Sequence, residues 1–224
     1  MNSKPRELIG RVLCSSLALL LGIWLLGVNP AAAASPTLLN DSELIDALRS
    51  GGYNIYFRHV STDWSQSDDL RQADDWLSCD PARMRQLSGP GRADAVAIGK
   101  AIRKLEMPIS EIIASPYCRT VETARLMDLG QVTPSTAVMN LRAAEYFGGR
   151  AAIVATAQAL LAMSPRPGTN RVIVAHGNVA QASTPVYPAE GEGVVFMPDD
   201  KGGFHLVGRI DPADWSRLVS LDKQ

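Results

Sequence analysis

The sequence has few histidines and few cysteines, and it has no long run of basic residues. Each of the first two types occurs three times in 224 residues, and the formal net charge is −1. Without a basic run, a nucleic-acid partner is not indicated. The three histidines, at positions 59, 176 and 205, show no metal-ligand spacing, so no zinc site is predicted. There is also no internal repeat or low-complexity segment, and 46% hydrophobic residues suit a globular core.

The first 34 residues have the pattern of a secretory signal peptide. Three basic side chains come first, an apolar stretch follows over residues 12–28, and the small-residue segment NPAAAASP comes last. This order predicts cleavage after Ala34 and export to the periplasm or the exterior, with no membrane attachment afterwards. The alternative is an uncleaved N-terminal membrane anchor, although 17 apolar residues are short for a bilayer span. We therefore expect a signal peptide over 1–34 and a single domain over 35–224.

Cleavage would leave two cysteines, Cys79 and Cys118. Two cysteines in an exported protein raise the question of a disulfide. The sequence leaves their pairing open, because spacing does not show whether the two side chains meet. If they pair, the 39-residue separation restricts the unfolded chain by roughly 4 kcal/mol on the simple chain-entropy estimate.

Predicted strands and helices alternate along the rest of the chain. This alternation predicts an α/β fold in three layers, αβα, with a mostly parallel central sheet. Residues 61–90 are polar and show no period, which predicts a long loop of the kind that usually serves a site. The predicted strands cover 53–58, 110–115 and 170–177, with a hairpin over 193–210. The predicted helices cover 39–50, 91–108, 116–130, 149–168 and 212–221.

Three of the predicted strands end in residues that a core does not favour. The first ends in RH at 58–59, the second in SP at 115–116 followed by Arg119, and the third in HG at 176–177. The carboxyl ends of parallel strands meet at one edge of a sheet, so two histidines and two arginines should converge there. Arginine and a helix N-terminus both favour phosphate, and a neutral imidazole attacks phosphorus. Nearby guanidinium charges keep that imidazole neutral. The residues therefore predict a phosphate site with a nucleophilic histidine.

Four motifs in this stretch resemble those of the histidine phosphatase superfamily, also called phosphoglycerate-mutase-like. RHVSTDW, LSGPGRADA, SPYCRTVETA and IVAHGN occur in the family's order and together are more specific than any one alone. The resemblance implies that His59 attacks the phosphoryl group and that water hydrolyses the phosphohistidine. It also implies that Arg58, Arg119, Thr62 and His176 hold the phosphate and stabilise its charge. No cofactor and no metal is implied.

The sequence departs from the family pattern in two places. Val60 replaces the usual glycine after the nucleophile, and Ala143 stands where many members have the glutamate that protonates the leaving group. Glu145, two residues further on, is the catalytic acid that we predict. The other carboxylates considered for this role are Asp63, Glu190 and Glu192.

We expect an exported phosphatase that acts on a phosphorylated small molecule or on an envelope glycan phosphate. Two alternatives remain open. The departures at Val60 and Ala143 would suit a non-catalytic phosphate-binding module on the same fold, and some small relatives are phosphohistidine protein phosphatases. Specificity should lie in residues 61–90 and 179–193, which carry no motif.

Overall fold

Six strands form one mixed sheet at the centre of the computed structural model, which describes residues 38–222. The strand order is β3-β2-β4-β1-β5-β6. All pairs from β3 to β1 are parallel, and β5 pairs antiparallel with both β1 and β6. The predicted α/β fold with a mostly parallel sheet is therefore confirmed, while the predicted signal peptide lies outside the described residues. The strands are β1 (Asn54–Arg58), β2 (Ile109–Ala114), β3 (Val132–Pro134), β4 (Asn170–Ala175), β5 (Gly193–Pro198) and β6 (Phe204–Ile210).

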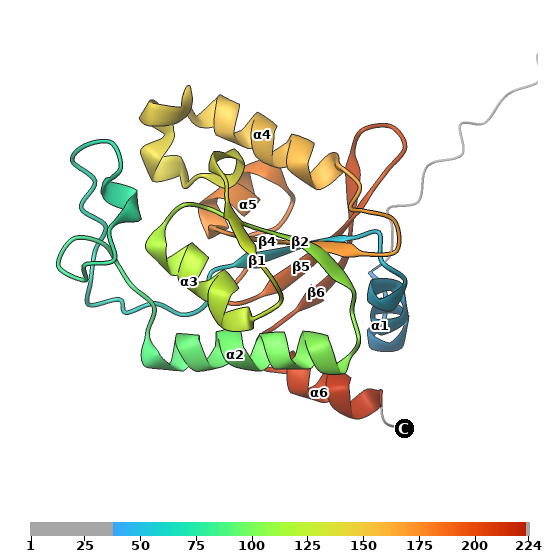
Figure 1. Ribbon diagram of the computed structural model, residues 1–224. Helices are drawn as coiled ribbons and strands as arrows, with labels where there is room; N and C mark the ends of the chain where they lie inside the picture. Colours follow the sequence, from blue (N-terminus) through green and yellow to red (C-terminus); the bar gives the residue numbers. More distant parts are fainter. Residues whose placement is uncertain (1–37, 223–224) are drawn as a thin grey trace, which may run out of the picture. The chain divides into compact units, whose positions relative to one another are not determined.

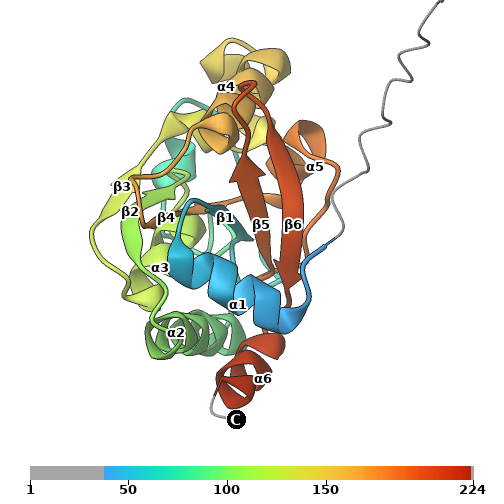
Figure 2. The ribbon, with the colours of Figure 1, turned by 90° about the vertical axis from the view of Figure 1, so that its right-hand side faces the viewer.

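Helices cover both faces of the sheet (Figures 1 and 2). Neighbouring residues of β1 show why: Ile55 and Phe57 pack into one core and Tyr56 into the other, because successive strand side chains point to opposite faces. The first face is covered by α1 (Asp41–Ser50), α2 (Gly89–Lys104), α3 (Cys118–Met127) and α6 (Asp214–Leu221). The second is covered by α4 (Arg150–Ala162) and α5 (Gly177–Ser183). The three layers follow from this arrangement.

Local sequence determines where the helices begin and how closely they approach. The Asn40 side chain accepts a hydrogen bond from the Glu43 backbone, and the Glu43 side chain accepts one from the Asn40 backbone, which starts α1 with a capping box. Gly99 allows α2 to lie against α3, because a Cβ atom there would be 1.8 Å from the Met127 carbonyl oxygen. This close contact holds the end of α3 against α2, while residues 115–117 alone separate the start of α3 from the carboxyl end of β2.

A short strand and a short α-helix were not predicted. Strand β3 has three residues at the edge of the sheet, and α5 has seven residues directly after His176. Neither is long enough to show a period in the sequence. The predicted helix over 149–168 is also shorter in the structure, where it ends at Ala162.

Residues 61–88 form the covering loop, which connects β1 to α2 and contains the short 3₁₀ helix η1 (Asp75–Leu77). Figure 1 shows this blue-green segment projecting beyond the sheet. A β-bridge between Thr62 and Leu87 closes its base. A disulfide between Cys79 and Cys118 ties it to the first residue of α3, which answers the question that the sequence left open. The loop is therefore fixed over the carboxyl ends of the strands.

No helix among residues 38–222 is long and apolar enough to cross a membrane.

Candidate phosphate-binding site

His59 directly follows β1 and is held by the sheet. Its backbone N–H donates to the Ala175 carbonyl at 3.0 Å, and its ring is only 2% exposed. The ring Nδ1 lies 3.0 Å from the Val60 carbonyl oxygen, so in the neutral ring Nδ1 carries the hydrogen and Nε2 keeps its lone pair. Burial, and then the charge of Arg119, lowers the pKa of His59 well below its ordinary value of 6.5. His59 is therefore a neutral imidazole with a free Nε2.

His176 follows β4 and faces His59 from the neighbouring strand. The two ring centroids are 5.7 Å apart, and the His176 ring is also 2% exposed. Its Nε2 lies 2.9 Å from the Ser115 hydroxyl oxygen, and its buried Nδ1 has no partner in the described residues. Burial, followed by the charges of Arg119 and His59, lowers the pKa of His176. When the Ser115 hydroxyl donates to Nε2, Nδ1 carries a hydrogen that is free to bind an anion.

Arg119 lies in the first turn of α3, as the sequence predicted, and pairs with Asp68 of the covering loop. Its two terminal nitrogens donate to the two Asp68 carboxylate oxygens at 2.9 and 3.1 Å. Both side chains are buried, with 2% and 1% exposed. The remaining guanidinium nitrogen of Arg119, Nε, has no partner among the described residues. Asp68 thus fixes the guanidinium from one side and leaves its Nε edge free.

Arg58 is arranged in the same way. One terminal nitrogen donates to the Pro188 carbonyl at 3.1 Å and the other to Glu190 at 3.3 Å, while Nε is buried without a partner in the described chain. The Glu190 carboxylate also accepts from the Thr62 hydroxyl at 2.9 Å. Arg58 and Thr62, both predicted phosphate ligands, are therefore brought together by a carboxylate.

Arg85 of the covering loop is a third arginine at the site, whereas the sequence favoured a solvated side chain at this position. Its guanidinium carbon lies 3.9 Å from the centroid of the Trp64 ring, and its buried Nε has no partner in the described residues. The charges of Arg119, Arg58 and Arg85 all lower the pKa of both His59 and His176. Three guanidinium groups therefore surround the two imidazoles.

The donor atoms that lack partners point to an anion. Arg58, Arg85 and Arg119 each leave Nε unpaired, and His176 leaves Nδ1 unpaired. A buried N–H without an acceptor costs free energy, so such groups are rare in folded proteins. Four of them beside three positive charges form a site for a dense anion such as phosphate.

No family model and no curated protein matches the sequence, whereas solved structures with a similar fold include several phosphatases. The protein histidine phosphatase SixA, solved in complex with tungstate, is 12% identical with a TM-score of 0.52, over 72% of this chain and 98% of that chain. A mycobacterial glucosyl-3-phosphoglycerate phosphatase is 16% identical with a TM-score of 0.49, over 69% and 96% of the two chains. A phosphoserine phosphatase from Entamoeba histolytica, in complex with phosphoserine, is 13% identical with a TM-score of 0.47, over 70% and 95%. This chain has the histidine phosphatase fold.

Within this histidine phosphatase fold, the structure does not bring the predicted acid, Glu145, to the histidines. Glu145 is exposed in the 3₁₀ helix η3 (Leu141–Phe147) and has no ion pair within the described chain. Ala143, at the position of the family's glutamate, is completely buried. The turn that buries Ala143 directs Glu145 to the surface.

Of the other carboxylates considered for the acid, one contacts the phosphate ligands. Asp63 is bound within the covering loop by Ser65 and Gln66. Glu192 is buried in an ion pair with Arg209. Glu190 contacts Arg58 and Thr62.

Val60, the second departure from the family pattern, is fully buried in the core. Its carbonyl oxygen accepts from His59 and so sets the tautomer of that ring.

His205 lies on β6 and pairs with Asp199 at 3.2 Å, away from the other two histidines. In the part of the chain that the structure describes, no three His, Cys, Asp or Glu side chains are grouped to hold a metal ion.

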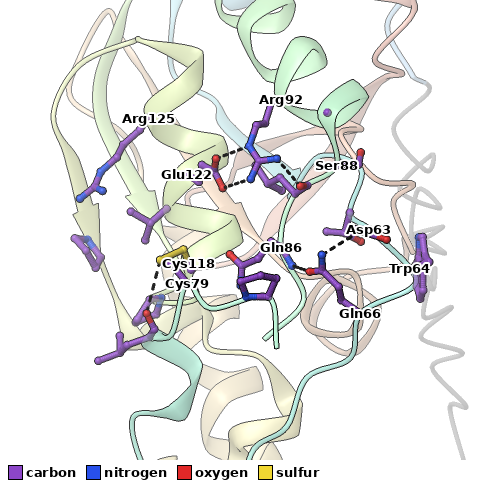
Figure 3. Close-up of a pocket in the computed structure, with 18 residues that line it drawn as sticks. Asp63, Trp64, Gln66, Cys79, Gln86, Ser88, Arg92, Cys118, Glu122 and Arg125 are labelled. Atoms are coloured by element: carbon purple, nitrogen blue, oxygen red, sulfur yellow. Dashed lines mark hydrogen bonds and ion pairs between the residues drawn. A yellow bond between two sulfur atoms is a disulfide. The ribbon is translucent and has the colours of Figure 1, made fainter. Parts of the chain in front are cut away.

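A cavity of about 1070 Å³ lies between the covering loop and helices α2 and α3. Figure 3 shows the ion pair of Arg92 with Glu122 and the Cys79–Cys118 disulfide among its lining residues. Neither His59 nor His176 lines it. Thr62 and Trp64 do, and each also contacts a residue of the phosphate site. The cavity and the phosphate site therefore share a wall.

Proposed function

We propose that the protein is a phosphatase that hydrolyses a phosphomonoester through a phosphohistidine intermediate on His59. The observation that carries this proposal is the set of unpaired buried nitrogens, on three arginines and His176, around a neutral histidine whose Nε2 is free. A site that only bound an anion would need these nitrogen donors, but it would not need a neutral histidine with a free Nε2. The likeness to histidine phosphatase structures supports the fold on which this chemistry occurs.

The reaction follows from the positions of the groups. His59 Nε2 attacks phosphorus, the N–P bond forms, and the bond from phosphorus to the leaving oxygen breaks. Arg58, Arg85, Arg119 and the Nδ1–H of His176 bind the phosphoryl oxygens and stabilise the charge that spreads over them. Water then attacks the phosphohistidine and the electron pair of the N–P bond returns to Nε2. These protein groups supply the positive charge, so the proposed reaction needs no metal or other cofactor.

The proposed substrate is a phosphorylated small molecule or an envelope glycan phosphate. Both histidines are 2% exposed beneath the covering loop, which favours a slender phosphate-bearing group over a phosphohistidine on a folded partner. We infer that the cavity beside the site holds the rest of such a molecule, because Thr62 and Trp64 line it and contact residues of the site, and Trp64 is 66% exposed. Hydrolysis rates for sugar phosphates, phosphorylated glycans and a phosphohistidine protein would rank these classes.

We also propose that the protein is exported after cleavage at Ala34. The pattern of residues 1–34 and the Cys79–Cys118 disulfide both support this, because disulfides persist in oxidising compartments. The N-terminal sequence of protein recovered from a periplasmic extract or from the medium tests it. An intact N-terminus in the membrane fraction would favour the anchor.

The first experiment is hydrolysis of p-nitrophenyl phosphate by the protein and by His59→Ala, without added metal. Release of phosphate by the parent and none by the variant supports the proposal. Equal rates would remove His59 as the nucleophile. Binding of phosphate without turnover in either protein would make the binding module the better description.

A further inference from the structure

Glu190 is a carboxylate that contacts two of the predicted phosphate ligands, Arg58 and Thr62. It lies in the segment between α5 and β5, and the next residue, Gly191, donates its backbone N–H to the carbonyl oxygens of Arg58 and His59 at 3.2 and 3.0 Å. These bonds hold the segment against the nucleophile. The Glu190 side chain is 15% exposed, so it lies at the rim, where it can exchange a proton with solvent.

The two oxygens of Glu190 are bound unequally. Oε1 accepts from Arg58 at 3.3 Å and from the Thr62 hydroxyl at 2.9 Å. Oε2 has one long contact, 3.4 Å from the Thr62 backbone nitrogen. One oxygen is therefore fixed by two phosphate ligands, and the other has capacity to carry and release a proton.

Asp68, the second carboxylate at the site, has no such capacity. Both of its oxygens accept from Arg119, and one also accepts from the Arg85 backbone N–H at 3.1 Å. It is 1% exposed, so solvent does not reach it. Asp68 orients Arg119, and the transfer of a proton is left to Glu190.

We propose that Glu190 is the general acid and base of this reaction, an inference that rests on the phosphatase function proposed above. In the first step, protonated Glu190 gives its proton to the leaving oxygen as the bond from phosphorus to that oxygen breaks and the N–P bond to His59 forms. In the second step, the Glu190 carboxylate takes a proton from the attacking water as the N–P bond breaks. The residue ends each cycle protonated, ready for the next substrate.

The test compares Glu190→Gln on two substrates that differ in how much their leaving group needs a proton. Glutamine keeps the size and the hydrogen bonds to Arg58 and Thr62 but cannot donate a carboxyl proton. We expect kcat/KM for glycerol phosphate, which covers the step that releases an alkoxide, to fall by about 10²–10⁴-fold, the usual contribution of a general acid. For p-nitrophenyl phosphate, which releases a stable phenolate, we expect kcat/KM to fall by less than about tenfold, while kcat falls on both substrates because they share the phosphohistidine whose hydrolysis Glu190 assists as a base. The alkaline fall in the rate on glycerol phosphate, which a general acid causes when it loses its proton, should also be absent from the pH profile of Glu190→Gln.

Two matched variants separate this role from others. Glu145→Gln makes the same change at the exposed carboxylate that the sequence favoured, and it should leave both rates unchanged. Asp68→Asn should raise KM by the same factor for both substrates, because it disturbs the phosphate ligand Arg119 and not the departure of the leaving group. Equal losses of kcat/KM on both substrates in Glu190→Gln would make Glu190 a structural partner of Arg58 and overturn the proposal. Full activity in Glu190→Gln would also overturn it, and an inactive parent protein would remove the phosphatase function together with it.

Discussion

The phosphate site is assembled from two regions of the molecule that are held in different ways. The strand-end group consists of Arg58, His59, Arg119 and His176. The loop group consists of Asp68, Arg85 and Glu190. The first group is fixed by the backbone hydrogen bonds of the sheet and the start of α3. The second lies on two connecting segments: the covering loop, which the disulfide ties to α3, and the segment before β5, which is held by the hydrogen bonds from Gly191 to the Arg58 and His59 carbonyl oxygens.

This difference in support corresponds to a difference in role between the two groups. The strand ends move little because each is one end of a buried, hydrogen-bonded strand, so they suit the nucleophile and its charge partners. The loop group contacts the strand-end group from outside, through Asp68 on Arg119 and Glu190 on Arg58. Changes in the strand-end group should therefore stop the chemistry, and changes in the loop group should alter binding and proton transfer.

The strongest expected effect is on the nucleophile. His59→Ala should lower kcat by about 10³-fold or more, as loss of a nucleophile does elsewhere. Rapid acid quenching with radiolabelled substrate should show an acid-labile phosphoenzyme in the parent protein and none in this variant. Asp68→Asn, a change in the loop group, should still become labelled. Label on His59→Ala would place the nucleophile elsewhere and break the distinction between the two groups.

The buried pair of Arg119 and Asp68 joins the two groups, and its partners should not be equivalent. Removing Asp68 leaves the buried Arg119 without its carboxylate, which costs about 3–5 kcal/mol of stability, whereas removing Arg119 leaves Asp68 with the exposed Arg142 at 3.9 Å. In Asp68→Asn, however, phosphate can pair with the free Arg119, whereas in Arg119→Ala the remaining Asp68 repels it. Phosphate should therefore raise the melting temperature of Asp68→Asn and not that of Arg119→Ala. Equal phosphate responses in the two variants would contradict the placement of Arg119 as a ligand.

The sequence predicted the strand-end group and not the loop group, for a physical reason. Residues at strand ends follow apolar runs that are visible in the sequence, and the parallel sheet brings them to one edge. Asp68 and Arg85 lie in a stretch without periodicity, where nothing indicates which side chains turn inward. Choosing between Glu145 and Glu190 required knowing that a short turn buries Ala143 and exposes the former.

The same limit applies to the fold. Alternating helices and strands were evident, and so was the hairpin of β5 and β6, because each element is long enough to show its period. The sheet order depends on contacts between distant segments, such as Ile55 with Val172, that no local pattern records.

The disulfide should matter for the loop group more than for the strand-end group. In a Cys79→Ala, Cys118→Ala double variant, the free energy of unfolding should fall by roughly 4 kcal/mol, because the unfolded chain is no longer restricted. The freed loop must then be ordered by substrate, which at a cost of about 1.4 kcal/mol would raise KM about tenfold. Steady-state kinetics and urea unfolding, with the parent protein measured with and without reductant, give both quantities. A loss of kcat with KM unchanged would mean that the disulfide supports the strand-end group instead.

The smallest expected effect is a pH dependence of stability that comes from the strand-end histidines. Burial, and then the charge of Arg119, holds the pKa of His59 well below 6.5 in the folded protein, while the unfolded chain keeps the ordinary value. Below pH 6.5 the unfolded chain therefore binds a proton that the folded protein does not. The free energy of unfolding should then fall with decreasing pH by up to about 1.4 kcal/mol per pH unit for each such histidine, and should level off above 6.5.

Glutamine does not titrate, so His59→Gln should reduce the change of unfolding free energy with pH by the contribution of one histidine. Urea unfolding between about pH 5 and 7.5, in a buffer free of phosphate, measures the difference between the two curves. Because both proteins share every carboxylate, the difference isolates the ring. Parallel curves would mean that His59 is protonated equally in the folded and unfolded states, and the strand-end group would then lack the neutral nucleophile that separates it from the loop group.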